Sequence, residues 1–294
     1  MARDAARQDW ATRRERGTVP LIRLMVWIVL RVGRPAAQTL LVPVVVYFFL
    51  FSAKSRAASL AYLGRALGRP ATAVDRWRHY WCFASCLLDR VWLLNGRLDL
   101  FEISVQGEKF VTAIRARAGG AFLFGAHFGS FEVARSAGRH MAGVKTSLIM
   151  FEANARKTNA VLNSINPALA IEIIGLGKPG SMLMVRDRLD DGHLVGILAD
   201  RSLTGERSVS IPFLGAPARF PVGPFRMAAL LRQPVLLMLG LRRGGGHYDV
   251  IFETISSDPA IDEIESTMCR YVARLEQHCR DAPYNWFNFY DFWA

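Results

Sequence analysis

The fold that we expect for this chain follows from one stretch of sequence, Gly119-Gly-Ala-Phe-Leu-Phe-Gly-Ala-His127-Phe-Gly-Ser-Phe-Glu132. Its first part, residues 119–126, is a short apolar run of the kind that forms a buried strand. Residues 131–141 then follow a helical pattern of apolar positions, so the stretch predicts a strand, a tight turn and a helix. His127 should lie in the turn and Glu132 in the first turn of the helix.

This placement predicts a pair of catalytic side chains. A histidine in the turn can fold back onto a first-turn carboxylate, so Glu132 would fix the ring tautomer of His127 and stabilise its protonated form. Backbone N–H groups near Gly129 and Ser130 could hold a developing negative charge. Ser130 is expected to contact substrate or to cap the helix. On spacing alone, the pair could equally be a turn histidine beside a carboxylate that favours the helix dipole.

Beyond residue 100, short apolar segments alternate with helical patterns. Such alternation indicates a mixed α/β sheet with helices on both faces. The expected strands are 121–126, 147–151, 171–175, 194–199, 209–213, 235–241 and 248–255. The expected helices are 108–117, 131–141, 153–163, 181–190, 224–231 and 261–280, after an amphipathic helix at 71–95.

The first 56 residues are expected to form a basic arm and a membrane-associated apolar segment, and residues 57–294 the catalytic domain. Pro35 through Ala53 carry no charge, and a helix of that length spans about 28 Å, close to the hydrocarbon thickness of a bilayer. Pro43 would kink it, and residues 21–30 suit a helix in the headgroup layer. The apolar run begins too late for a cleavable signal peptide. Membrane attachment is therefore expected, either by a span or at the interface.

The charge balance points to an anionic partner. The formal net charge is +12 and comes largely from arginine. A phospholipid surface, a phosphorylated lipid or an acidic carrier protein would fit this charge. No helix-turn-helix, zinc module or RNA-binding strand is present in the sequence, which argues against nucleic acid. The four cysteines (Cys82, Cys86, Cys269 and Cys279) are expected to be reduced cytosolic thiols, and no His or Cys cluster has metal-ligand spacing.

Several segments, taken in order, resemble the bacterial lipid A late acyltransferases, the lauroyl and myristoyl transferases. They are AHFGSFE around His127-x4-Glu132, VGILADR at 195–201, IPFLGAPA at 211–218 and PYNWF at 283–287. The resemblance covers roughly residues 20 to 294. The chain departs from the family where Ser130-Phe131 replace a frequent Asn-Trp, and where the closing NFYDFW is acidic although many members are basic there.

The resemblance implies an acyltransferase in which His127 is the general base and Glu132 its partner. It implies an acyl-thioester donor, either acyl carrier protein or coenzyme A, an anionic lipid acceptor of lipid A type, and no separate cofactor. It also implies a place at the cytoplasmic face of the bacterial inner membrane. Arg156 matches a basic position near the phosphorylated substrate, and Asp200 and Arg201 match the family's strand that ends in Asp, so the resemblance implies that these three residues bind substrate. Asp200 and Arg201 could also form a structural ion pair.

Other functions share parts of this pattern. GLGKPG at 175–180 matches the dinucleotide fingerprint G-x-G-x-x-G, and Asp200 ends the next strand where a ribose-binding acid is expected. Pro179 within the motif and Arg201 after the acid weaken that interpretation. A lysophospholipid or glycerol-phosphate acyltransferase would use the same His-x4-acid chemistry on another acceptor. A non-catalytic protein that binds the membrane surface is the alternative from another class.

Overall fold

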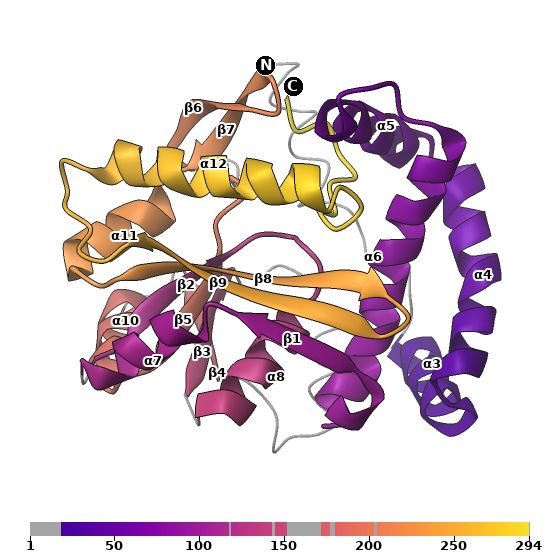
Figure 1. Cartoon of the computed structure of the whole chain (residues 1–294), viewed down its shortest axis with the longest axis horizontal. Coiled ribbons are helices and arrows are strands. Elements are labelled where there is room, and N and C mark those ends of the chain that lie inside the picture. The colour runs from indigo at the N-terminus through magenta and orange to yellow at the C-terminus, as the bar shows by residue number, and fades with distance from the viewer. Residues whose placement is uncertain are drawn as a thin grey trace.

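The fold is built around a seven-stranded mixed sheet, with the strand order β1-β9-β8-β2-β5-β3-β4 (Figure 1). The computed structural model describes residues 19–117, 119–142, 145–151, 172–176, 180–202 and 205–293. The strands are β1 (Glu102–Gln106), β2 (Ala121–Gly125), β3 (Thr146–Phe151), β4 (Glu172–Leu176), β5 (Leu194–Leu198), β8 (Val235–Gly244) and β9 (His247–Ser256). From β8 to β4 all neighbours are parallel, whereas β9 is antiparallel to β8. The carboxyl ends of β2 and β5 therefore lie side by side at one edge.

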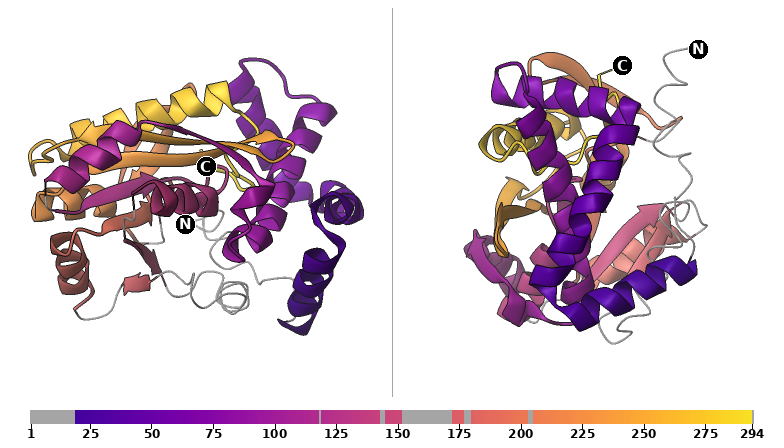
Figure 2. Two further views of the ribbon diagram at one scale, coloured as in Figure 1. Left: turned by 60° about the horizontal axis from the view of Figure 1, so that its bottom comes forward. Right: turned by 90° about the vertical axis from the view of Figure 1, so that its right-hand side faces the viewer.

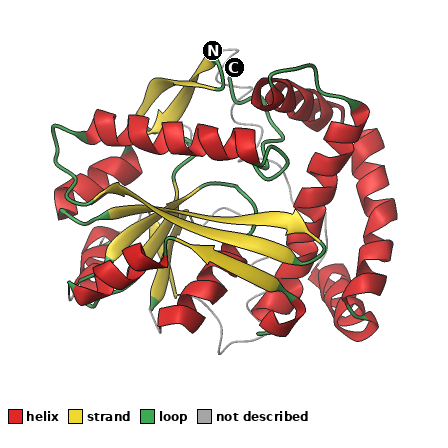
Figure 3. Cartoon of the chain, in the orientation of Figure 1, coloured by secondary structure: helices red, strands yellow, loops and turns green. Residues whose placement is uncertain are grey.

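Helices cover both faces of this sheet, as the sequence predicts (Figure 3). They are α7 (Glu108–Ala116), α8 (Phe131–Ala142), α10 (Ser181–Asp190), α11 (Gly223–Leu231) and α12 (Ile264–Asp281). Because side chains alternate along a strand, Phe122 and Phe124 of β2 pack with α10, α11 and α12, while Leu123 packs with α7 and α8. All five residues of β2 are buried. A central strand of this kind gives the residues that follow it a rigid support.

Two strands have no counterpart among the expected elements. β1 lies at the edge of the sheet and pairs only with β9, and its residues alternate between exposed and half-buried, so it lacks the apolar run of the central strands. β7 (Ala216–Pro221) forms an antiparallel hairpin with β6 (Ser208–Phe213). Two prolines in β7 hide its strand character in the sequence. The helix expected at 153–163 lies outside the described residues.

Four helices pack at one end of the sheet: α3 (Val19–Val32), α4 (Arg34–Phe51), α5 (Ala53–Leu67) and α6 (Ala73–Leu94). Gly33, with φ of +79°, separates α3 from α4, and α4 continues through Pro43. Thr72 and Asp75 form a reciprocal capping box that starts α6. By length and composition, α4 is apolar enough to cross a membrane, with a mean hydropathy of 1.5. Figure 2 shows α3 and α4 as the outer layer of this end.

Candidate active site

His127 and Asp200 meet at the edge where β2 and β5 end. Gly125 and Leu198 are register partners in the two parallel strands, so the residues two positions beyond each strand are neighbours. The Nδ1 atom of His127 lies 2.9 Å from Oδ1 of Asp200, and the backbone N–H of His127 donates to Oδ2 at 3.1 Å. Asp200 is fully buried, whereas 32% of the His127 side chain is exposed. The carboxylate is thus held inside the protein while the imidazole faces outward.

This contact defines the chemical state of the imidazole. A carboxylate only accepts hydrogen bonds, so Nδ1 of His127 carries the proton and Nε2 of the neutral ring holds the free lone pair. Burial lowers the pKa of His127, and Arg201 lowers this pKa further, although Asp200 acts in the opposite direction. Burial alone would raise the pKa of Asp200, but His127 and Arg201 outweigh it and hold this pKa well below its usual value. At neutral pH the site therefore contains a carboxylate beside a neutral base.

The C-terminal segment completes the site. Nε1 of Trp286 donates to Oδ2 of Asp200 at 3.0 Å, and both side chains are fully buried. The backbone N–H of Phe287 donates to the carbonyl of His127 at 2.8 Å. Nη2 of Arg201 donates to the carbonyl of Phe287 at 2.8 Å, while its Nε lies 3.9 Å from Asp200. The structural ion pair that was the alternative for Asp200 and Arg201 is therefore present, and Arg201 also holds the C-terminal segment at the site.

A second histidine, His79, is hydrogen-bonded to the backbone of Trp286. Nε2 of His79 lies 2.9 Å from the carbonyl of Trp286, and Nδ1 lies 2.8 Å from Oγ of Ser59. The carbonyl can only accept, so Nε2 carries the proton and Ser59 donates to Nδ1. Burial lowers the pKa of His79 to about 4, so the ring is neutral at physiological pH. Sequence reasoning missed Trp286 and His79 as parts of the site, although the PYNWF ending had marked the position of Trp286.

The carboxylate that orients His127 is not Glu132. Oε1 of Glu132 lies 2.6 Å from Nε of Arg90, which comes from α6. Glu132 lies in the first turn of α8 and pairs with the neighbouring helix α6. Asp200 follows the neighbouring strand β5 and contacts the imidazole. The expected His127–Glu132 contact is thus corrected to His127–Asp200.

Gly129 and Ser130 do not offer their backbone N–H groups to a substrate. The N–H of Gly129 donates to the carbonyl of Asn285 at 2.8 Å, and that of Ser130 to the carbonyl of Gly240 at 2.7 Å. Gly129 has φ of +60°, and a Cβ there would lie 1.9 Å from the Gly240 carbonyl oxygen, so only glycine fits. Ser130 is buried, and its Oγ caps α8 by accepting from the N–H of Val133. The expected capping is confirmed, and the two backbone N–H groups expected to hold an oxyanion are occupied within the protein.

The remaining predicted residues fall into two groups. Arg156 and the centre of the 175–180 glycine motif lie outside the described residues. Gly175 belongs to β4, and Gly180 precedes α10. Asp200 cannot serve as a ribose-binding acid, because both of its oxygens are bonded inside the protein. Within the described ranges, no group of three or more His, Cys, Asp or Glu side chains is placed to hold a metal ion.

The α/β sheet thus places a buried aspartate and an outward-facing histidine at the ends of two parallel strands, an arrangement that is chemically able to accept a proton. The model of the family described as bacterial lipid A biosynthesis acyltransferase matches residues 18–294. The chain belongs to this family. No curated protein matches the chain in sequence.

Proposed function

We propose that the protein transfers a fatty acyl group from an acyl thioester to a hydroxyl group of a lipid A-type acceptor, with His127 as the general base. Membership of the family supports acyl transfer to this class of acceptor. The observation that carries the catalytic assignment is the 2.9 Å contact between Nδ1 of His127 and the buried Asp200. This contact leaves Nε2 as the proton acceptor on an imidazole that is one-third exposed.

The chemistry then follows from the positions of the protons. Nε2 of His127 takes the proton of the acceptor hydroxyl while the oxygen attacks the thioester carbonyl, and Asp200 stabilises the imidazolium that forms. The tetrahedral intermediate collapses by breaking the C–S bond, and the imidazolium returns its proton to the departing thiolate. The residues of the turn donate their N–H groups within the protein, so the oxyanion needs other donors. The nearby N-terminus of α8 adds the positive end of a helix dipole.

We place this reaction at the cytoplasmic face of the bacterial inner membrane, where acyl carrier protein and coenzyme A thioesters are available. The membrane-associated part would be α3 and α4, and the catalytic domain would begin within α5, near residue 57. Tyr62 of α5 supports this division, because its ring packs against Trp286 at 4.9 Å between centroids and belongs to the main core.

The test is acyl transfer by the purified protein, with the product lipid identified by mass spectrometry. Acyl carrier protein and coenzyme A thioesters are supplied in separate reactions, each with a lipid A precursor or with lysophosphatidic acid. His127→Ala should lower the rate by about 10²–10⁴-fold with only a moderate fall in Tm, because the buried Asp200 loses the imidazole but keeps its hydrogen bonds from Trp286 and from the backbone N–H of residue 127. Parental turnover by this variant would refute the assignment of His127. Transfer to lysophosphatidic acid alone would instead favour the glycerolipid alternative.

A thermal-shift measurement addresses the dinucleotide alternative. If the 175–180 motif is only a turn, NAD and NADP should leave Tm unchanged. A ligand present at 100 times its Kd would stabilise the protein by about 2.7 kcal/mol. A saturable shift with NAD or NADP and none with a nonreactive acyl-thioester analogue would overturn the acyltransferase proposal.

A further inference from the structure

The outer side of α3 and α4 presents large apolar side chains to solvent. We call this surface the apolar face; it is formed by Trp27, Leu40, Val44, Tyr47, Leu50 and Phe51. Their exposed fractions run from 36% for Val44 to 69% for Phe51, and no charged residue lies between Pro35 and Phe51. Several large apolar side chains exposed on two helices that are in contact indicate a site of protein or membrane interaction.

The opposite side of α4 packs against the catalytic domain along the whole length of the helix. Near the start of α4, the buried Ala37 joins a cluster with Leu88 and Trp92 from the end of α6. Near its end, the ring of Phe49 packs against Trp77 at 5.7 Å, at the start of α6. The two helices therefore lie antiparallel and in contact from end to end, and Figure 2 shows them together at this end of the molecule.

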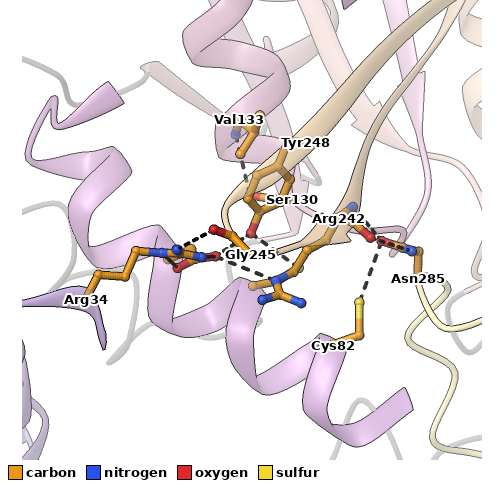
Figure 4. A network of polar contacts seen from close by, with 10 residues as sticks. Arg34, Cys82, Ser130, Val133, Arg242, Gly245, Tyr248 and Asn285 are labelled. Carbon is orange, nitrogen blue, oxygen red and sulfur yellow. Dashed lines mark hydrogen bonds and ion pairs between the residues drawn. The ribbon is translucent and has the colours of Figure 1, made fainter. Parts of the chain in front are cut away.

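A buried ionic cluster fixes the beginning of α4. Nε and Nη2 of Arg34 donate to the two carboxylate oxygens of Asp89 at 2.8 and 3.1 Å. The hydroxyl of Tyr248 donates to Asp89 at 2.8 Å, and Nε of Arg242 lies 3.7 Å away. Arg34 also donates to the carbonyl of Gly245. Figure 4 shows Arg34 directed toward the β8–β9 hairpin and toward Arg242 and Tyr248. Asp89 is fully buried, so this cluster ties α4 to both α6 and the hairpin.

We propose that the protein docks on the bilayer through the apolar face, with α4 lying in the plane of the membrane and not spanning it. A spanning α4 would carry α6 into the hydrocarbon, together with Asp75, Arg76 and Arg90 on that helix, or else break the Asp89 cluster. An in-plane α4 inserts only its exposed side. Arg31 and Lys54, exposed near the two ends of α4, would then both meet anionic headgroups.

The occupant of this surface is a lipid bilayer, because the apolar face is rich in aliphatic and aromatic side chains and bordered by cations at both ends. A protein partner would leave the face closed to lipid even when vesicles are present. Docking through the apolar face and the proposed acyl transfer have in common only their location at a membrane. Failure of the docking proposal would leave acyl transfer intact, and loss of acyl transfer in a His127 variant would leave docking intact.

Flotation with vesicles of phosphatidylethanolamine and phosphatidylglycerol tests the surface. Leu40→Lys and Leu50→Lys should each weaken partitioning by about 10-fold or more, because each removes a leucine that lipid would bury. The matched controls are Leu230→Lys and Ile261→Lys, which are similarly exposed but lie on α11 and before α12. They should float as the parent protein does. Equal losses for both pairs, or for neither, would overturn the proposal.

Depth measurements separate the in-plane from the spanning arrangement. Nitroxide labels are attached to the cysteine of Val44→Cys or Phe51→Cys, in a Cys269→Ser background that removes the exposed cysteine. The two positions are seven residues apart, so they lie on the same side of the helix and about 10 Å apart along its axis. An in-plane α4 predicts nearly equal depths in the same vesicles, close to the headgroups. A label at Val44 near the bilayer centre, with Phe51 near the surface, would refute the proposal and show a span.

Discussion

Two fully buried aspartates, Asp200 and Asp89, show what separates a reactive site from a structural one. Each accepts a hydrogen bond from an aromatic donor, Trp286 at 3.0 Å and Tyr248 at 2.8 Å. Their basic partners differ. Besides Arg201 at 3.9 Å, Asp200 has an imidazole partner that is one-third exposed and can exchange a proton. Asp89 has only Arg34 and Arg242 as basic partners among the described residues, and their guanidinium groups keep their charge. Both carboxylates are thus buried. The chemical nature of the basic partner distinguishes the aspartate of the candidate active site from the structural one.

Among the substitutions that test this comparison, Asp200→Asn should have the largest effect on kcat. The amide keeps the shape but cannot stabilise the imidazolium or fix the Nδ1 tautomer, so we expect kcat to fall by about 10³–10⁴-fold, as in other His–Asp pairs. The measurement is initial rate under saturating substrates, with Tm recorded in parallel. A loss below tenfold would show that Asp200 does not act through His127.

Asp89→Asn should damage the fold and spare the chemistry. It leaves two buried guanidinium groups without their carboxylate, and breaking a buried pair in this way costs about 3–5 kcal/mol. We expect a lower Tm, with kcat per folded molecule close to the parent value. Asp99→Asn is the matched control, because Asp99 pairs with Arg97 at the surface and should leave Tm almost unchanged. Equal effects on Tm would contradict the structural role of Asp89.

Trp286→Phe tests the hydrogen bond between Trp286 and Asp200 through the pH dependence of the rate. Neutral His127 is the active form, so the rate is lost as pH falls through its pKa, and the acid limb of the parent should lie below pH 6.5 because that pKa is lowered. Without the indole N–H, Asp200 holds its charge closer to the imidazole, which raises the pKa of His127. The acid limb should then move to higher pH, with the plateau rate reduced by less than about 10-fold.

Trp293→Phe provides the control for that shift. The Trp293 ring also packs on Phe213, but its Nε1 donates to the carbonyl of Phe213 instead of Asp200. This variant should keep the parental acid limb. If both variants shifted the limb equally, loosened packing of the C-terminal segment would explain the result better than the lost hydrogen bond.

Only a small catalytic effect is expected for Glu132→Gln. Glu132 pairs with Arg90 and not with His127, so the variant should keep the acid limb of the parent and lose less than about 10-fold in kcat, with a modest fall in Tm. A loss as large as that of Asp200→Asn would restore Glu132 as the partner that the sequence first indicated.

Much of the fold is visible in the local pattern of the chain. The apolar run before His127 and the helical period after it predict β2, the turn and α8, because each element follows from neighbouring residues. The strands from β3 to β6, together with β8 and β9, were also expected from their sequences, although β4 and β6 are less buried than β2. Edge strand β1 and proline-containing β7 were missed, since neither has the signal of a buried strand.

The sequence by itself determined that His127 lies at the end of a buried strand, and that the chain has a long uncharged segment near its start. Only the tertiary structure decided which carboxylate reaches the imidazole, because Asp200 is 73 residues away and arrives through the pairing of β2 with β5. It also decided that carbonyls of Gly240 and Asn285 occupy the turn's N–H groups, and that α4 lies along α6. Such contacts depend on strand order and helix packing, which periodicity along the chain does not encode.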